Sequence, residues 1–121
     1  MKKNLSDKLA ASIAQLEHAL TFRKQISKEP VYFLAITKAY EVCLEYAWKH
    51  LKARLNSDGI EAYSPKEVIK EAGRAHLLDD VESWLRFINE RNLMVHDYLG
   101  ISDDEYLETI TTFLKTVKKL R

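Results

Sequence analysis

Hydrophobic residues recur through most of the chain at spacings of three and four positions, which is the period of an amphipathic α-helix. The pattern predicts one helix over residues 5–24 and a second, the most buried, over residues 30–55, which Pro30 opens at little cost because a first-turn N–H has no helical partner. The hydrophobic faces comprise Leu5, Leu9, Ile13, Leu16 and Leu20 in the first helix and Phe33, Ile36, Tyr40, Leu44, Ala47, Leu51 and Leu55 in the second.

Helix-capping residues mark three more helices in the second half of the chain. The run Ser64-Pro65-Lys66-Glu67 places serine at an N-cap, proline at the first helical position and glutamate at the third. It begins a short helix that is predicted to end at Ala75 and to be weakened by Gly73. Two further caps are predicted, at Asp79 and Asp80 with Glu82 for a fourth helix, and at Ser102 with Glu105 for a last one.

These elements predict an all-α fold, an antiparallel four-helix bundle with one extra short helix, in a single domain over residues 1–121. The chain has only 3 Gly and 2 Pro, so long helices with few turns are favoured over many short strands. No segment alternates with the period of two that is typical of a half-buried strand.

Composition narrows the classes of function. With a net charge of +1, the protein has no overall positive field that would attract nucleic acid or a membrane surface. Lysines and Arg121 nevertheless crowd the last turns of the final predicted helix. A solvated face that complements the helix dipole is favoured there over a nucleic-acid patch. The single Cys43 excludes an internal disulfide, fits a small buried hydrophobe, and indicates a reducing cytoplasm. No apolar run approaches the roughly 18 residues of a membrane span.

The densest chemistry lies in residues 91–98, which hold a guanidinium (Arg91), an amide (Asn92), an imidazole (His96) and a phenol (Tyr98). Gly100 follows and is typical of a helix stop, so the stretch is predicted to occupy the last turns of a helix. At about 100° per residue, Asn92 and His96 share a face, whereas Arg91 and His96 lie roughly 140° apart. The two groups meet only if Arg91 wraps around, if the backbone is irregular, or if two subunits build the site.

Other chemistry is not indicated. The sequence has no glycine-rich phosphate loop, no HExxH and no paired cysteine, and its four histidines form no i, i+4 pair that would hold a metal. Glu41 and Glu45, with Lys38 and Lys49, fit surface ion pairs better than an acid–base dyad. No metal and no cofactor are therefore expected.

Three segments resemble the HEPN family of small helical proteins, and within it the nucleotidyltransferase substrate-binding protein group, whose relatives include the HepT toxins. They are residues 39–49 in the second helix, residues 64–72 at the start of the third, and residues 91–98. The last segment matches the family's Arg-polar-x(3)-His pattern and its longer RxxxxHxY form. His76 departs from the resemblance, because many relatives have a glycine before the next helix.

The resemblance implies a homodimer with the motif near its interface, and a small nucleotidyltransferase partner encoded nearby. In the toxin branch it also implies a metal-independent endoribonuclease that the partner neutralises, in some systems by transferring AMP to a tyrosine, here Tyr98. RNA cleavage without a metal needs a base for the 2′-hydroxyl proton, which His96 fits, and a cation for the phosphorane, which Arg91 fits. Asn92 would orient the imidazole or contact phosphate, and Tyr98 would stack on a base or carry the modification.

Three hypotheses remain open on the sequence alone. The first is a ribonuclease toxin that acts through Arg91 and His96. The second is a non-catalytic subunit that presents a nucleotide or another substrate to a separate nucleotidyltransferase. The third is a structural dimer with a relict motif. The intact motif favours the first two, and the near-neutral charge argues mildly against a general ribonuclease.

Overall fold

The structure is a computed structural model that describes residues 4–95 and 102–120. Within these ranges it contains α-helices and one short 3₁₀-helix and no strand, so the predicted all-α class is confirmed. The elements are α1 (Leu5–Leu20), η1 (Arg23–Gln25), α2 (Val31–Ser57), α3 (Pro65–Arg74), α4 (Val81–Val95) and α5 (Asp103–Val117).

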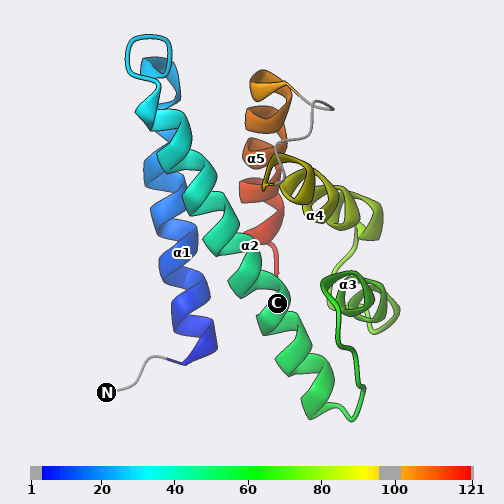
Figure 1. Cartoon of the computed structure of the whole chain (residues 1–121). Helices are drawn as coiled ribbons and strands as arrows, with labels where there is room; N and C mark the ends of the chain where they lie inside the picture. Colours follow the sequence, from blue (N-terminus) through cyan, green and yellow to red (C-terminus); the bar gives the residue numbers. More distant parts are fainter. Residues whose placement is uncertain (1–3, 96–101, 121) are drawn as a thin grey trace.

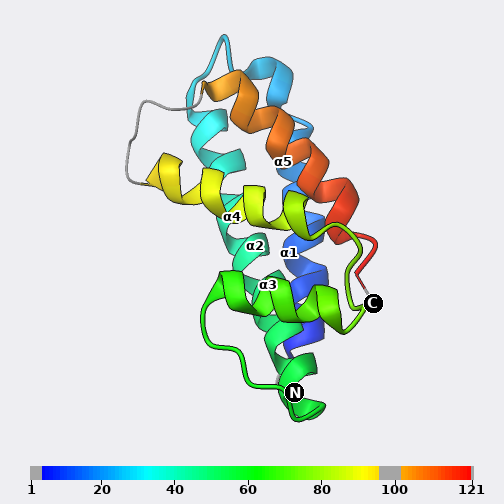
Figure 2. The same ribbon diagram turned by 90° about the vertical axis from the view of Figure 1, so that its right-hand side faces the viewer.

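The helix α2 is the centre of the arrangement. α1 runs antiparallel beside it along most of its length, as Figure 1 shows. α3 and α4 lie across α2 at a steep angle, one beyond the other, and α5 packs against α1 and α4 (Figures 1 and 2). The end of α4 therefore lies beside the middle of α2, which matters for the site because Arg91 and Asn92 belong to that end.

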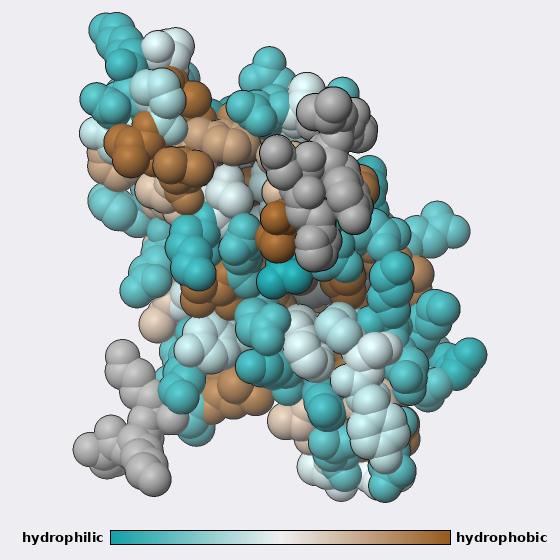
Figure 3. Space-filling model, in the orientation of Figure 1, coloured by the Kyte–Doolittle hydropathy of each residue, from teal (hydrophilic) through white to brown (hydrophobic). Residues whose placement is uncertain are grey.

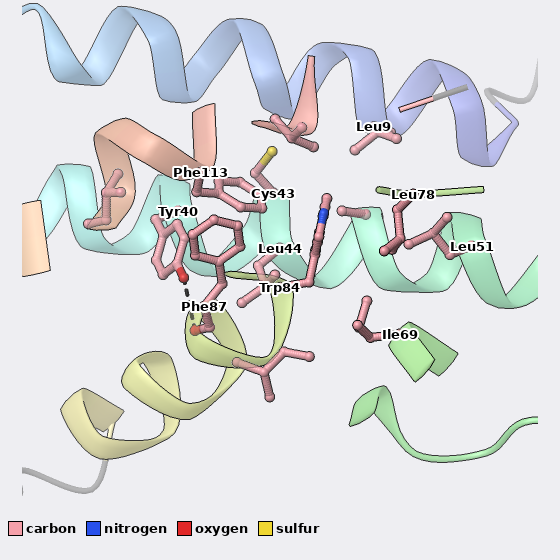
Figure 4. Close-up of a cluster of buried hydrophobic side chains, with 14 of the residues drawn as sticks. Leu9, Tyr40, Cys43, Leu44, Leu51, Ile69, Leu78, Trp84, Phe87 and Phe113 are labelled. Atoms are coloured by element: carbon pink, nitrogen blue, oxygen red, sulfur yellow. Dashed lines mark hydrogen bonds between the residues drawn. The ribbon is translucent and has the colours of Figure 1, made fainter. Parts of the chain in front are cut away.

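Aromatic side chains fill the core where α2, α4 and α5 meet (Figure 4). The ring of Phe113 has edge-to-face contacts with the rings of Tyr40, Trp84 and Phe87, at centroid distances of 5.1, 5.7 and 5.3 Å. Rings at such distances and angles attract one another beyond their hydrophobic burial. Sequence periodicity predicted Tyr40 as a core residue, but it did not select Phe87, which is fully buried.

Several predicted helix ends are confirmed in atomic detail. The Ser64 hydroxyl accepts from the backbone N–H of Glu67, and the Ser102 hydroxyl accepts from that of Glu105, both at 3.2 Å. The cap of α4 differs from the prediction, because Asp80 alone makes it. One Asp80 carboxylate oxygen accepts from the Ser83 backbone N–H at 3.1 Å, and the other accepts from the Ser83 hydroxyl at 2.6 Å.

The first helix is shorter than predicted, ending at Leu20 instead of residue 24. The Thr21 hydroxyl donates to the His18 carbonyl at 2.6 Å, and the chain then tightens into η1. This turn directs Arg23 onto α5, where its guanidinium donates to Glu108 at 2.8 Å and to Thr111 at 3.2 Å. A contact across the bundle therefore replaces the last predicted turn of the helix.

A hydrophobic patch, bordered by hydrophilic side chains, lies over the end of the molecule where α1 passes into α2 (Figure 3). Val31 is 54% exposed and Leu34 is 66% exposed there. Leu34 lies seven residues before Glu41, so the two residues share a face of α2.

No helix in the described part of the chain is both long and apolar enough to cross a membrane.

Two helices end in the same hydrogen-bonding motif but with different residues at the left-handed position. After α2, Gly59 has φ +80°, the Ile60 N–H donates to the Leu55 carbonyl, and the Gly59 N–H donates to the Asn56 carbonyl. After α3, His76 takes the equivalent place with φ +61°, and the two backbone bonds recur one for one. Glycine is therefore the residue that the backbone at position 76 would favour, since a Cβ is strained in this conformation.

We expect His76→Gly to raise the free energy of unfolding by about 0.5–1 kcal/mol, because it removes left-handed strain but also gives the unfolded chain more freedom. The reciprocal control, Gly59→Ala, should lower the same quantity by about 1 kcal/mol. Urea denaturation followed by circular dichroism measures both. A loss of stability in His76→Gly would mean that the imidazole makes a contact worth more than the strain.

Candidate functional site

The structure places two of the four predicted site residues. Arg91 and Asn92 lie in the last two turns of α4, and both are partly buried. The Arg91 guanidinium donates to the Asn92 amide oxygen at 3.1 Å, so the side chain of Asn92 orients Arg91 here. His96 and Tyr98, which were predicted as the base and as the stacking or modified residue, lie outside the described residues.

Two hydrogen bonds fix the helix that carries Arg91. The buried hydroxyl of Tyr40, on α2, donates to the backbone carbonyl of Phe87 at 3.0 Å (Figure 4). One turn further along α4, the Glu90 carboxylate accepts from the Thr109 hydroxyl of α5 at 2.5 Å. These bonds lie one and four residues before Arg91, so they set the rotation of α4 and direct Arg91 towards α2.

Arg91 borders a cleft of about 220 Å³ between α2, α3 and α4, which we name the Trp48 cleft. α2 forms one wall, the first turn of α3 forms another, and the end of α4 forms the third. The lining residues are Glu41, Leu44, Glu45, Trp48, Ser64, Pro65, Lys66, Ile88, Arg91 and Asn92.

A second cleft of about 310 Å³, the Lys38 cleft, opens on the outer side of α2. Arg91, Glu41 and Glu45 line both clefts, so the guanidinium lies where the two meet. The other residues that line the second cleft are Lys38, Val42, Tyr46 and Lys49. A cation shared by two open clefts can contact an anion that enters from either one.

Acidic groups surround this cation. Burial would raise the pKa of Glu45, but the pKa is lowered overall because the Trp48 indole N–H and Lys49 donate to the carboxylate and because Lys49 and Arg91 are positively charged. The Trp48 indole N–H lies 3.0 Å from one Glu45 oxygen, and the Lys49 ammonium lies 3.2 Å from the other. The predicted ion pair is therefore confirmed for Glu45. Glu41 has no hydrogen bond or ion pair with any described residue.

Two buried phenols lie behind the guanidinium. Burial raises the pKa of Tyr40 and of Tyr106 far above the ordinary value, and the positive charge of Arg91 opposes the rise in both. The negative charge of Glu41 adds to the rise for Tyr106. Both phenols are therefore neutral at physiological pH, and neither acts as a base in this state.

A comparison with models of known protein families identifies the family of this chain. Residues 4–121 match the family model described as nucleotidyltransferase substrate binding protein like. The chain belongs to this nucleotidyltransferase substrate-binding-like family. The match covers nearly the whole chain, and the family's description implies a relationship with a nucleotidyltransferase.

A curated relative of this family member is the probable ribonuclease HepT of Haemophilus influenzae. It is 33% identical over 60 residues, which cover 49% of this chain and 41% of the relative. The chain therefore spans less than half the length of the curated relative it matches. The relative's name associates it with ribonuclease activity, and the likeness agrees with the HepT-like resemblance of the three segments.

The three segments that resemble the family converge on the Trp48 cleft. Residues 39–49 supply its α2 wall, residues 64–72 supply Ser64, Pro65 and Lys66, and residues 91–98 supply Arg91 and Asn92. Sequence reasoning did not select Glu41, Glu45 or Trp48 as site residues. Their spacing of four and three places them on one face of α2, and that periodicity was the signal that could have found them.

Other groups with chemical potential lie away from the clefts. Cys43 is fully buried, and burial raises its thiol pKa to about 11, against the opposing hydrogen bond with Ser12, so the expected role as a small buried side chain is confirmed. Among the described residues, no three His, Cys, Asp or Glu side chains gather in a way that would hold a metal ion. The chemistry of the described site therefore comes from Arg91 and the cleft around it.

Tyr40→Phe should lower the free energy of unfolding by about 1 kcal/mol. The substitution removes the hydrogen bond between α2 and the Phe87 carbonyl, and it leaves the backbone of α4 unchanged. Tyr106→Phe is the matched control, since the buried Tyr106 hydroxyl has no hydrogen-bond partner among the described residues. It should change stability by less than Tyr40→Phe. Chemical denaturation of both variants measures the difference, and equal losses would show that the Tyr40 hydroxyl does not fix α4.

Proposed function

We propose that this family member is the helical subunit of a two-component nucleotidyltransferase module. It binds the phosphate of a nucleotide or RNA through Arg91 with His96 and Tyr98, and it acts as a metal-independent endoribonuclease toxin that its nucleotidyltransferase partner neutralises. The convergence of all three family-like segments on one cleft beside Arg91 carries this proposal. The name of the HepT relative supports the ribonuclease activity.

The proposed reaction uses two side chains. The neutral imidazole of His96 takes the proton of a ribose 2′-hydroxyl, and the 2′-oxygen attacks the adjacent phosphorus. The bond between phosphorus and the 5′-oxygen breaks, a 2′,3′-cyclic phosphate forms, and the leaving oxygen takes a proton from water. The Arg91 guanidinium stabilises the negative charge that builds on the phosphorane oxygens, because its planar donors match them.

The angle between Arg91 and His96 favours a site that two copies of the chain share. On an ideal helix, Arg91 and His96 point roughly 140° apart, so a two-fold dimer in which one chain supplies Arg91 and the other supplies His96 brings them together. The exposed Val31 and Leu34, near the start of α2, are apolar side chains that such a dimer would cover. This dimer is part of the proposal.

One observation favours the second candidate, a non-catalytic subunit that presents a nucleotide to the partner. The clefts beside Arg91 carry mixed charges. Glu41 and Glu45 line both clefts with Arg91. Lys66 lines one of the two clefts, and Lys38 and Lys49 line the other. This balance suits one small nucleotide better than a long polyanionic strand, whose affinity depends on many phosphate contacts. The family's description agrees with a substrate-binding subunit.

Replacing the two motif residues tests catalysis. Arg91→Ala should slow RNA cleavage by about 10²–10³-fold, and His96→Ala by about 10²–10⁴-fold, because each loses a group that acts on the transition state. Arg86→Ala, which removes an arginine from the exposed side of the same helix, should cleave like the parent. The measurement is the cleavage rate of a fluorescent RNA in EDTA, with dimerisation checked by size-exclusion chromatography.

Mixing Arg91→Ala with His96→Ala tests the composite site. In a dimer that shares residues, each mixed pair contains one intact Arg91 and His96 combination, so part of the activity returns. No recovery would place both groups in one chain. If the parent protein does not cleave RNA but binds a nucleotide, and Arg91→Ala weakens that binding, the result would favour the non-catalytic substrate-binding subunit.

Transfer of AMP by the partner tests the switch. After incubation with the neighbouring nucleotidyltransferase and ATP, intact-mass spectrometry should show one AMP group per chain, and RNA cleavage should fall because a bulky anion then stands beside Arg91 and His96. Tyr98→Phe should stay unmodified. Tyr63, which is 67% exposed outside the motif, provides the internal comparison, and modification there instead of at Tyr98 would count against the switch.

A further inference from the structure

The Trp48 cleft has the shape of a site for one ring system. Its volume of about 220 Å³ lies below the roughly 300–1,000 Å³ of pockets that hold drug-sized ligands. Leu44, Ile88 and Pro65 provide the apolar part of its lining, beside polar and charged side chains. A flat, partly apolar ring fits this lining better than a sugar or a free phosphate does.

Trp48 presents an aromatic wall in a fixed orientation. Its indole N–H donates to Glu45 at 3.0 Å, and Lys49 holds the other oxygen of the same carboxylate. The indole therefore has its one polar atom satisfied, and its ring stays available to the cleft. Stacking of a nucleobase on an aromatic side chain contributes a favourable free energy that does not depend on which base is present.

Glu41 supplies the group that can choose between bases. It lines the cleft beside Arg91, it is partly buried, and no described residue donates a hydrogen bond to its carboxylate. Arg91 lies near but donates to Asn92. An ionised carboxylate only accepts, and its two oxygens match two N–H groups side by side.

Among the four RNA bases, guanine has this pair of donors, N1–H and the N2 amino group, on one edge. Adenine and cytosine place a ring acceptor beside their amino group, and uracil places its N–H between two carbonyls, so each of them brings a lone pair against a carboxylate. We propose that the Trp48 cleft is a base-recognition subsite in which Trp48 stacks on guanine and Glu41 binds its N1–H and N2 amino group. This rests on the proposed function, since Arg91 then holds a phosphate of the same nucleotide.

Binding of guanosine, GMP, AMP, CMP and UMP by isothermal titration calorimetry tests the subsite on the full chain. GMP should bind about tenfold to a hundredfold more tightly than the other nucleotides, the discrimination that a good bidentate contact gives. Glu41→Gln should lose that preference, because an amide presents one acceptor and one donor. Glu82→Gln, which alters an exposed carboxylate at the far end of α4, should keep it.

Fluorescence assigns the binding to the cleft. Guanosine should quench the parent and should not quench Trp48→Phe, in which the buried Trp84 is the remaining tryptophan. Equal affinity for the four nucleotides, or guanosine binding that Glu41→Gln leaves unchanged, would overturn the subsite. These outcomes are separate from failure of the phosphate site, because Arg91→Ala should weaken GMP but not guanosine.

Discussion

The hydrogen bond from the Tyr40 hydroxyl to the Phe87 carbonyl is the constraint on which the candidate site depends. It joins the centre of α2 to α4 inside an aromatic cluster, where a polar group without a partner would be costly. α4 therefore has one favoured rotation against α2, and Arg91, four residues further on, points into the angle between the two helices. A rotation by one residue would turn the guanidinium away from both clefts.

Local signals in the sequence predicted much of the fold. Serine caps, a first-turn proline and the three–four spacing of apolar residues depend on neighbours in the chain, and they placed the helices to within a few residues. The early end of α1 was missed because it goes with a hydrogen bond from Arg23 to Glu108, a residue far away in the sequence. The left-handed His76 was anticipated only as a departure from the glycine of many relatives.

The site was predicted only in part, for a related reason. The motif selected Arg91 and Asn92 from their chemistry, and both line the cleft. The acidic and aromatic wall opposite them depends on how steeply α4 crosses α2, which no local pattern encodes. Glu41 and Glu45 were interpreted as surface ion-pair residues, because charged residues at helical spacing usually lie on a solvated face. The crossing turned this face into the wall of a cleft.

The environment of the lone thiol has a practical consequence. Cys43 is the one cysteine of the sequence, it is fully buried, and its pKa of about 11 keeps it protonated near neutral pH. Alkylating reagents react with thiolates, so Cys43 adds little unwanted label when another position is labelled through an introduced cysteine. A single cysteine introduced on the rim of either cleft could therefore carry a spin label or a dye without first removing the natural one, which makes distance measurements across an assembled complex straightforward.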